Sequence, residues 1–347
     1  KTKDPEVFTE SIKVDDRVLR TVVSHLEAIN LNKTDLDVKG VAFEQFMDGF
    51  FKGDFGQYFT PREIIDFCVK MTKPQNDQDV LDPSCGSGGF LLHALDYMRT
   101  QANDYYEKGT VEHFNYWHDF AAKHLYGIEI NDEIARVAKM NMIVHDDGHT
   151  NVISCDALES IDKMHAHNRG YAANKFDLIL TNPPFGSMIN KTQKPYLESF
   201  ELGNTVDKKG KKTPRKNQSS EVLFIERIWQ FLKPKTGKAA IVLPDGILTN
   251  SSMQYVRDFI LDRFQLLAVV SLPQCAFAHF GAGVKASVIF VRKRGKDETP
   301  DDNEPIFMAS PEFIGYDATG RKIKENQFDE IVQKYEDFCK DATPFFE

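Results

Sequence analysis

The stretch from Val80 to Phe90 reads VLDPSCGSGGF, and it decides the fold of this chain. A short apolar run ends at Asp82 and enters a glycine-rich turn, which opens a segment of helical character. Gly86 and Gly88 allow the backbone to approach a ligand closely, and open parallel sheets bind ligands outside the carboxyl ends of their strands. The turn therefore predicts a nucleotide-type site, with a plain tight turn and packing glycines as the simpler alternative.

The same turn departs from two common phosphate-binding motifs. Leu91 stands where the G-x-G-x-x-G dinucleotide motif has its third glycine. A P-loop would require a lysine after the turn, and none is present. The ligand is therefore expected to be neither a dinucleotide nor a P-loop triphosphate.

On both sides of the turn, from Gly56 onward, short apolar runs alternate with amphipathic segments, which is typical of a parallel sheet with crossover helices. We predict an α/β fold with seven strands, at 79–82, 125–129, 151–155, 176–181, 238–243, 266–271 and 285–291. We predict helices at 61–71, 89–99, 131–144, 221–232 and 251–264. Two connections, 100–124 and 187–220, are too long for ordinary loops, so we expect them to serve substrates or partners.

The residues before this core have helical spacing. Val18, Val22 and Leu26 belong to a predicted helix over 15–29, and a second is predicted over 41–51. We divide the chain into a helical N-terminal region at 1–55, a main domain at 56–295 and a C-terminal extension at 296–347. Because the sequence starts with lysine and not methionine, we expect the N-terminal region to be incomplete.

Composition bounds the class of protein. Of 347 residues, 41% are hydrophobic and 27% charged, an ordinary globular composition that excludes wholesale disorder. No apolar run approaches the roughly 20 residues that a membrane span needs, so we expect no membrane partner. The five cysteines form no C-x-x-C pair, and no histidine spacing matches a metal site. We therefore expect no metal and no disulfide framework, and a reducing cytoplasm as the location.

Charge is segregated along the chain. The net charge of −9 argues against non-specific coating of nucleic acid by the whole surface. Six of the nine residues at 208–216 are basic, whereas five of the eight at 297–304 are acidic. The basic segment predicts a local contact with anionic groups such as phosphates, with a solvated loop as the alternative.

Two further acids stand where later strands of the predicted sheet end. Glu129 is suited to the two hydroxyls of a ribose, and Asp156 to an adenine amino group. Ile130 and Ala157 directly follow them and join the predicted site. Each acid alone would serve equally well as a helix N-cap. Three acids at three strand ends favour a ligand site.

The segment 176–186 reads FDLILTNPPFG. Asn182 follows a buried apolar strand, and Pro183 and Pro184 fix the backbone and remove two N–H donors. The side-chain oxygen of Asn182 and the carbonyl of Pro183 then form a rigid pair of acceptors for a planar amino group, beside which Phe185 offers a face for stacking a base. A stiff turn without function is the alternative.

The glycine turn at 82–90 followed by Asn182-Pro-Pro-Phe185 resembles the S-adenosylmethionine-dependent amino-methyltransferases of DNA. The segment GQYFTP at 56–61 matches the motif that precedes the glycine turn in the class whose target domain comes last. The segments 239–246 and 277–287 are also similar, and the likeness extends from Gly56 to Arg292. The chain most resembles the modification subunit of type I restriction-modification enzymes, which methylate adenine N6.

This resemblance implies the class I methyltransferase fold, with 56–295 as catalytic domain and S-adenosyl-L-methionine as cofactor. It implies that Asp82, Gly86 and Gly88 contact the methionine part, Glu129 the ribose and Asp156 the adenine, while Phe59 and Thr60 complete the pocket near the cofactor carboxylate. Independently of the family, the residues TPRE at 60–63 predict a capping box, with Thr60 as N-cap and Pro61 at the first helical position.

The predicted chemistry is methyl transfer to an exocyclic amino group. Hydrogen-bond acceptance at Asn182 and Pro183 would draw the nitrogen toward tetrahedral geometry, so positioning and electrostatics replace a strong base. The adenine must leave the duplex, and Phe185 would hold it by stacking. Methylation at cytosine C5 would need a cysteine nucleophile, usually after proline, and the sequence has no Pro-Cys.

The resemblance also implies partners: double-stranded DNA, a separate specificity subunit that binds two copies of this chain, and a restriction subunit that translocates and cleaves, in a bacterial or archaeal cytoplasm. The 55 residues after Arg292 show no basic recognition helix, so we expect that this chain does not choose its DNA sequence. Two alternatives stay open. The first is a methyltransferase of protein glutamine amides or of guanine N2 in ribosomal RNA, because these enzymes also use the Asn-Pro-Pro-aromatic turn. The second is a scaffold whose methyltransferase core is catalytically inactive.

Overall fold

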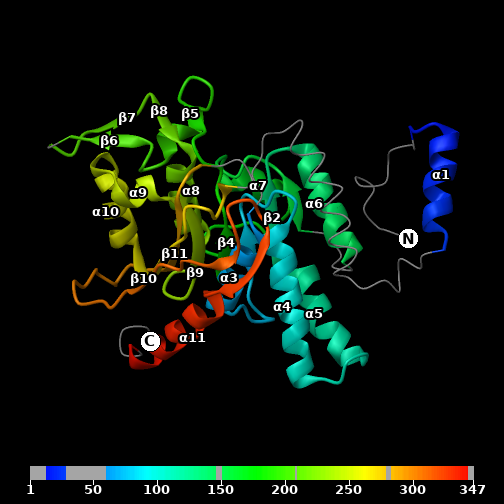
Figure 1. Ribbon diagram of the computed structural model, residues 1–347. Helices are drawn as coiled ribbons and strands as arrows, with labels where there is room; N and C mark the ends of the chain where they lie inside the picture. Colours follow the sequence, from blue (N-terminus) through cyan, green and yellow to red (C-terminus); the bar gives the residue numbers. More distant parts are fainter. Residues whose placement is uncertain (1–12, 29–59, 146–150, 208, 279–282, 343–347) are drawn as a thin grey trace.

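The computed structural model describes residues 13–28, 60–145, 151–207, 209–278 and 283–342, and its centre is a sheet with the order β12-β10-β11-β9-β4-β1-β2-β3 (Figure 1). The strands are β1 (Val80–Asp82), β2 (Leu125–Glu129), β3 (Val152–Ser154), β4 (Leu178–Thr181), β9 (Lys238–Pro244), β10 (Phe264–Ser271), β11 (Ala286–Lys293) and β12 (Phe307–Ala309). Within this sheet β11 runs antiparallel to both neighbours and the other pairs are parallel. The predicted mostly parallel α/β fold is confirmed, and each predicted strand is present.

The number of strands differs from the prediction, because the sheet has eight strands instead of seven. The additional strand is β12, which pairs in parallel with β10 and places Phe307 opposite Ala268. Its residues FMA are apolar, but the strand is only three residues long and none of its residues is fully buried, so the sequence pattern predicts no strand there. Part of the C-terminal extension thus belongs to the main sheet.

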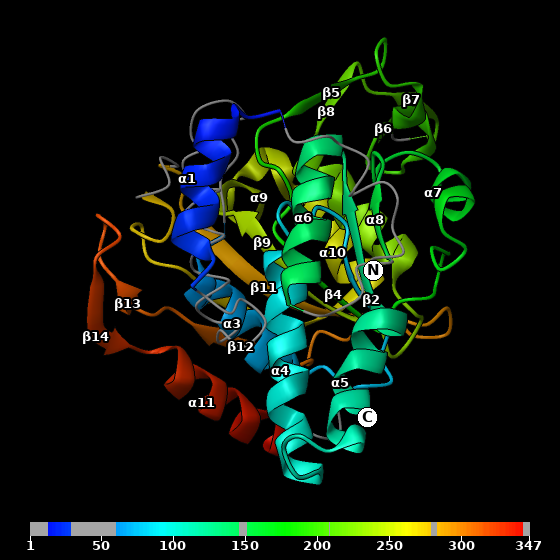
Figure 2. The ribbon, with the colours of Figure 1, turned by 90° about the vertical axis from the view of Figure 1, so that its right-hand side faces the viewer.

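Helices cover both faces of the sheet (Figures 1 and 2). One face carries α3 (Arg62–Thr72), α4 (Gly89–Tyr105), α5 (Val111–His124), α6 (Asp132–Val144) and α11 (Phe328–Asp341). The other carries α7 (Ile161–His167), α8 (Ser220–Phe231), α9 (Asp245–Thr249) and α10 (Gln254–Arg263), the last preceded by a 3-10 turn, η2 (Ser251–Met253). The five helices predicted between strands correspond to α3, α4, α6, α8 and α10.

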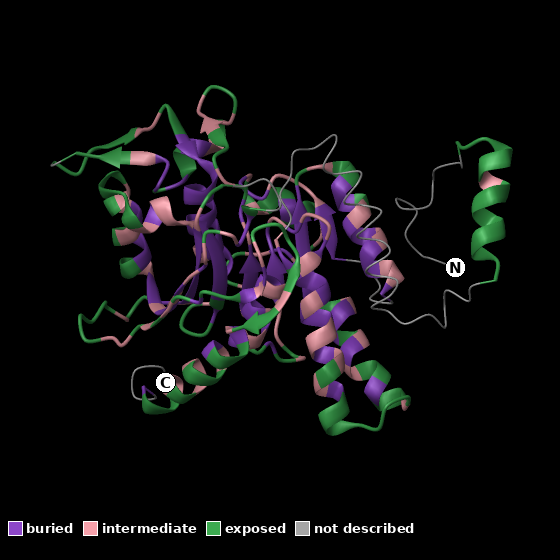
Figure 3. Ribbon diagram, viewed as in Figure 1, coloured by how far each residue is buried: buried purple, intermediate pink, exposed green. Residues whose placement is uncertain are grey.

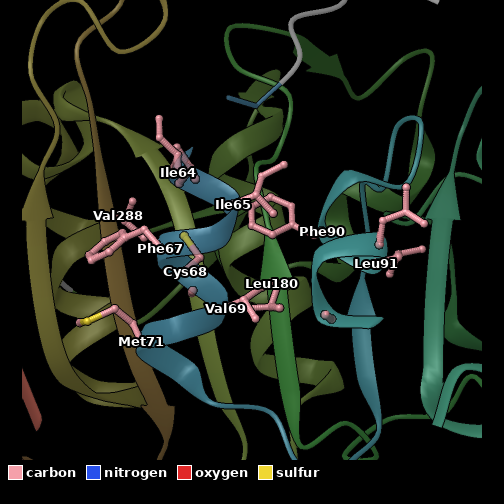
Figure 4. Close-up of a cluster of buried hydrophobic side chains, with 14 of the residues drawn as sticks. Ile64, Ile65, Phe67, Cys68, Val69, Met71, Phe90, Leu91, Leu180 and Val288 are labelled. Atoms are coloured by element: carbon pink, nitrogen blue, oxygen red, sulfur yellow. The ribbon is translucent and has the colours of Figure 1, made fainter. Parts of the chain in front are cut away.

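Alternation along the strands divides the apolar interior into two cores. In β1, Val80 belongs to one core and Leu81 to the other. Figure 4 shows part of the first core, where Phe67 of α3 lies near Val288 of β11 and Val69 of α3 lies near Leu180 of β4. The sheet strands are buried along most of their length (Figure 3). Because both faces are covered, the edge at the carboxyl ends of the strands is where a ligand reaches the sheet.

The connection at 100–124, predicted to be too long for an ordinary loop, is helical over most of its length. Residues 100–105 continue α4, and residues 111–124 form α5. The hydroxyl of Thr110 caps α5 by accepting from the backbone N–H of His113, and Phe114 packs edge-on against Trp117. Apart from Tyr106, the aromatic residues of this segment are therefore helical, and Tyr116 and Trp117 of α5 contact Tyr105 and Arg99 of α4.

The second long connection, 187–220, is folded. It contains β5 (Met188–Asn190), η1 (Pro195–Ser199), β6 (Asn204–Val206), β7 (Lys212–Pro214) and β8 (Asn217–Ser219), with β5 paired to β8 and β6 to β7. Leu197, Phe200 and Leu202 are buried. We call residues 187–220 the insertion, and its buried side chains fix it to the body of the domain.

The two ends of the chain differ. At the N-terminal end α1 (Asp16–Leu26) confirms one predicted helix, whereas the helix predicted at 41–51 lies outside the described residues. At the other end β13 (Ile314–Tyr316) pairs with β14 (Lys322–Asn326), and α11 packs on α3 through stacked rings of Phe67 and Phe328 at 4.3 Å. No helix among the described residues is long and apolar enough to cross a membrane.

Candidate active site

The glycine turn lies at the carboxyl end of β1, as predicted. Asp82 is 2% exposed, and its Oδ1 accepts from the backbone N–H of Ser84 at 3.0 Å and from the hydroxyl of Thr181 at 2.7 Å. Gly86 and Gly88 have φ of +52° and +91°, a region that side chains rarely adopt. A Cβ on Gly86 would meet no described atom within 4 Å, so the turn has an open side on which a ligand can lie against the backbone.

The charge of Asp82 is poorly stabilised by its surroundings. Burial raises the pKa of this carboxyl to about 7, the hydrogen bonds from Thr181 and Ser84 oppose the rise, and the nearby charge of Glu129 adds to it. Both hydrogen-bond donors are uncharged. A cationic ligand group beside Asp82 would favour its ionised form.

Glu129 ties the glycine turn to the next strand. Its Oε2 accepts from the backbone N–H of Gly86 at 3.1 Å, and its Oε1 accepts from the backbone N–H of Asn131 at 2.9 Å. Burial raises the pKa of this carboxyl as well. Ile130, next in sequence, is 60% exposed, although it is a large apolar side chain. An exposed apolar side chain beside a buried acid suits a ligand with both a hydroxylated and a planar apolar part.

Asp156 follows β3 and is held by the insertion. Its Oδ2 accepts from Lys194 Nζ at 3.0 Å and from the hydroxyl of Tyr196 at 2.9 Å. Its Oδ1 accepts from the backbone N–H of Leu158 at 3.0 Å. Ala157, between Asp156 and Leu158 in the sequence, is buried. Neither Lys194 nor Tyr196 was expected at this site, because they lie 38 and 40 residues further along the chain.

The Asn-Pro-Pro-Phe turn lies directly against the glycine turn. The hydroxyl of Ser84 lies 2.7 Å from that of Thr181 and 3.3 Å from the backbone oxygen of Asn182. The side-chain nitrogen of Asn182 donates to Thr60 Oγ1 at 2.9 Å. Its side-chain oxygen is buried and has no hydrogen-bond partner among the described residues. The amide is therefore oriented by Thr60, while its acceptor is left for another donor.

The start of α8 supports the far side of this turn. Ser220 donates to the backbone oxygen of Pro184 at 2.8 Å, and Glu221 Oε2 accepts from the N–H of Gly186 at 3.2 Å. Pro183 is buried, Pro184 is exposed and Phe185 is half-buried against the first core. The backbone of this turn is thus fixed at both ends, as the two prolines predict.

The predicted capping box at 60–63 is wrong. α3 begins at Arg62, and Pro61 is its N-cap without a side-chain capping bond. The hydroxyl of Thr60 accepts instead from Asn182, which lies 122 residues away in sequence. The Thr60 hydroxyl thus makes a tertiary hydrogen bond instead of a local capping bond. This bond places Thr60 beside Asn182 in the site. Phe59 lies outside the described residues.

The structure thus brings Thr60, Asp82, Glu129 and Asn182 into one hydrogen-bonded group through the glycine turn. Sequence reasoning missed a set of supporting residues, namely Ser84, Thr181, Lys194, Tyr196, Ser220 and Glu221. Only Ser84 and Thr181 carry a local signal, as hydroxyl residues inside the two motifs. The others reach the site through tertiary contacts.

These residues fit S-adenosylmethionine. The open side of Gly86 gives space for a close ligand, the buried Asp82 suits a cationic group, and Ile130 offers an exposed apolar surface for a base. The buried side-chain oxygen of Asn182 stays without a hydrogen-bond partner among the described residues.

Comparisons with known proteins show the family of this chain. The profile of the N-6 DNA methylase family matches residues 34–346. The methylase subunit of type I restriction enzyme EcoEI from Escherichia coli is 28% identical over 283 residues, covering 80% of this chain and 51% of that protein. The StySPI methylase subunit from Salmonella potsdam is 30% identical over 245 residues, covering 70% and 41%. This chain spans about half the length of these curated relatives.

Solved structures show the same fold. A protein named as a modification subunit of a type I restriction enzyme from Vibrio vulnificus gives a TM-score of 0.71 at 22% identity, covering 95% of this chain and 64% of that one. A protein named as a class I S-adenosylmethionine-dependent methyltransferase from Listeria monocytogenes gives 0.63 at 16% identity, covering 96% and 88%. The fold is that of class I methyltransferases, and by the match over residues 34–346 the chain belongs to the N-6 DNA methylase family.

Proposed function

We propose that this chain is the methyl-transferring part of an adenine-N6 DNA methyltransferase, in the modification subunit of a type I restriction-modification complex. The observation that carries the proposal is the buried, unpartnered side-chain oxygen of Asn182 beside the glycine turn. An unsatisfied buried acceptor costs about 1–3 kcal/mol, so a substrate donor is expected to complete it. The amino group of a flipped adenine is such a donor.

The two acceptors of the turn act on the target nitrogen. The lone pair of an exocyclic amino group is delocalised into the ring, which makes the nitrogen a poor nucleophile. If Asn182 Oδ1 and the carbonyl of Pro183 accept its two hydrogens, they stabilise the positive charge that develops on nitrogen during transfer. Pro184 stiffens the turn, and Phe185 stacks on the base after it leaves the duplex.

The neighbouring residues hold the cofactor. S-adenosylmethionine supplies an electrophilic methyl group when it is bound. Asp82, with the backbone at Gly86 and Gly88, binds its amino-acid part, and Glu129 accepts from its ribose hydroxyls. Asp156 accepts from the adenine amino group, Ala157 contributes backbone contacts and Ile130 packs on the base. Thr60 orients Asn182, and we keep Phe59 as part of the proposed pocket.

We propose double-stranded DNA and the other subunits of the complex as partners. The curated relatives are methylase subunits of type I restriction enzymes, and a solved relative comes from a study of the assembly of a type I system. Restriction-modification enzymes of related fold have been solved bound to DNA. On this basis we propose a specificity subunit that binds two copies of this chain, together with a restriction subunit.

We also propose that this chain does not select its DNA sequence. An acidic stretch at 297–304 follows β11 after three residues. Its acids Asp297, Glu298 and Glu304 pair with Lys235, Arg292 and Arg294, and the stretch contains no basic residue that could bind phosphates. The residues that follow are used in packing: β12 extends the sheet and α11 lies on α3, where Lys70 pairs with Asp329 at 2.8 Å. A site-reading interface of roughly 1,000 Å² would have to come from elsewhere.

Replacing Asn182 tests the function directly. Asn182→Ala should lower methyl transfer to DNA by about 100-fold or more, because it removes an acceptor that acts in the transition state. The dissociation constant of S-adenosylhomocysteine, measured by calorimetry, should stay within a few-fold. Loss of both together would make Asn182 a structural residue of the cofactor pocket and defeat the proposal.

Thr60→Val is the companion variant. If Thr60 acts by orienting Asn182, methyl transfer falls by about tenfold, the loss of one buried hydrogen bond, and cofactor affinity is unchanged. If Thr60 contacts the cofactor, as the family resemblance implies, the dissociation constant rises instead. The same calorimetry distinguishes the two roles.

A further inference from the structure

The insertion presents two side chains to Asp156 from a fixed support. Lys194 and Tyr196 flank the start of η1, whose Leu197 is fully buried in the second core, as is Phe200 just after it. Glu226 of α8 accepts from the backbone N–H groups of Glu201 and Leu202, both at 2.8 Å. The segment that carries Lys194 and Tyr196 is therefore anchored in the body of the domain.

The loop after β3 is anchored on the same helix. Arg227 donates to the backbone oxygens of Leu158 and Glu159 at 3.0 and 2.7 Å, and its guanidinium lies 5.0 Å from the ring of Phe200. Neighbouring residues of α8 thus hold the insertion and the Asp156 loop against each other. The contact between Lys194, Tyr196 and Asp156 is a consequence of packing, not a chance meeting of surface side chains.

The carboxylate of Asp156 is nearly saturated. A carboxylate has about four acceptor positions. Leu158 N–H, Lys194 Nζ and Tyr196 Oη occupy three of them. Burial and the charge of Asp156 raise the pKa of Tyr196, which keeps its hydroxyl protonated and donating. With the donors of the described residues counted, one acceptor position is left, and the other three set its direction.

We propose that Lys194 and Tyr196 complete the adenine end of the cofactor site as positioning residues, by fixing Asp156 as an acceptor for one neutral N–H donor. The inference rests on the proposed role of Asp156. A fixed acceptor favours a 6-amino purine and opposes a 6-oxo purine, whose carbonyl oxygen would face the carboxylate. Lys194 offsets the charge of Asp156, so that a neutral base can bind beside it.

The test compares two ligands by calorimetry: S-adenosylhomocysteine and its 6-oxo analogue, S-inosylhomocysteine. The unchanged chain should bind the amino ligand much more tightly. Lys194→Met and Tyr196→Phe should each weaken the amino ligand by about tenfold while weakening the oxo ligand less, so the preference shrinks. Lys191→Met is the matched control, because Lys191 pairs with Glu198 of η1 at 2.7 Å and has no bond to Asp156. Both ligands should bind to it as to the unchanged chain.

The outcomes separate the two proposals. Equal weakening of both ligands in Tyr196→Phe and Lys194→Met, or no change in either, overturns the positioning role. Asp156→Asn tests the underlying assignment on its own, since it should remove most of the preference for the amino ligand. A preference that survives Asp156→Asn shows that the adenine is bound elsewhere. Thermal unfolding of each variant verifies that it is folded. If one of the two positioning variants does not fold, the other still tests the proposal.

Discussion

Asp82 and Asp156 lie at the same edge of the sheet, after β1 and β3, yet the protein treats their charges in opposite ways. Asp82 is buried and accepts from Ser84 and Thr181, both uncharged, and its pKa is raised to about 7. Asp156 faces the ammonium of Lys194 at 3.0 Å. The described partners of the Asp82 carboxylate include no positive charge, so a cationic ligand group would stabilise it. The carboxylate of Asp156 is already paired with Lys194.

This difference orients the proposed cofactor. One end of S-adenosylmethionine carries two cationic groups, the α-ammonium and the sulfonium, together with the α-carboxylate, and the other end is a neutral adenine. The cationic end matches Asp82 and the neutral end matches Asp156, with Glu129 between them at the end of β2. The order of the three strands in the sheet, β1-β2-β3, is thus the order of the three cofactor parts.

The largest difference in cofactor affinity is expected between two substitutions of the same type, Asp82→Asn and Asp156→Asn. Asp82→Asn removes the charge that a cation would meet in a buried place, so it should raise the dissociation constant of S-adenosylhomocysteine by about 100-fold, the loss expected for a buried charged hydrogen bond. Asp156→Asn removes a charge that is already offset and should raise it by about tenfold. Isothermal titration calorimetry measures both.

Asp79→Asn is the control for these variants, because Asp79 lies just before the other end of β1 and pairs with His124 at 2.9 Å. It should leave the dissociation constant unchanged. Equal losses at Asp82 and Asp156, or a larger loss at Asp156, would contradict the assignment of the cationic end to Asp82.

A smaller effect is expected from pH. Without a ligand the pKa of Asp82 is about 7, and the α-ammonium of S-adenosylhomocysteine favours the ionised carboxylate, so protons compete with the ligand. Affinity should be nearly constant above pH 8 and should fall by about tenfold between pH 8 and pH 6 as Asp82 takes up its proton. The pH dependence measured with Asp82→Asn gives the contribution of the ligand's own titration, which is subtracted from that of the unchanged chain. The account fails here if the variant and the unchanged chain show the same pH dependence.

The smallest effect concerns the basic part of the insertion. Lys209, Lys211 and Lys212 are exposed on the β6–β7 hairpin, whereas the Arg215 guanidinium lies 4.3 Å from the ring of Tyr255. We propose that the three lysines contact DNA phosphates. Replacing them with serine should flatten the slope of log affinity against log salt by roughly one unit for each lost contact. The assembled complex is titrated with DNA at several salt concentrations.

The matched control replaces three exposed lysines of the C-terminal extension, Lys322, Lys334 and Lys340. An effect of equal size there would mean that the salt dependence reports net charge and not a DNA contact on the hairpin. An unchanged slope in the hairpin variant would remove the hairpin from the DNA-binding surface.

The comparison also separates what sequence patterns can predict from what they cannot. Part of the surroundings of Asp82 is local, since Ser84 and the two glycines follow within six residues and the strand–turn–helix pattern reveals them. Its second donor, Thr181, comes from β4. The surroundings of Asp156 depend on Lys194 and Tyr196, which only the packing of the insertion brings near. Thr60 shows the same limit, because its local pattern predicts a cap while its hydroxyl is taken by Asn182. Periodicity predicts the sheet, and it is silent on tertiary hydrogen bonds.

Product analysis tests the central claim most directly. The chain, assembled with its specificity subunit, is incubated with methyl-labelled S-adenosylmethionine and DNA, and the DNA is digested to nucleosides. The account predicts label in N6-methyladenine, at defined sites only when the specificity subunit is present, and none with Asn182→Ala. Label in a cytosine derivative, or in RNA or protein in place of DNA, would contradict the proposed reaction, and site-selective methylation by the chain alone would contradict the proposed division of labour.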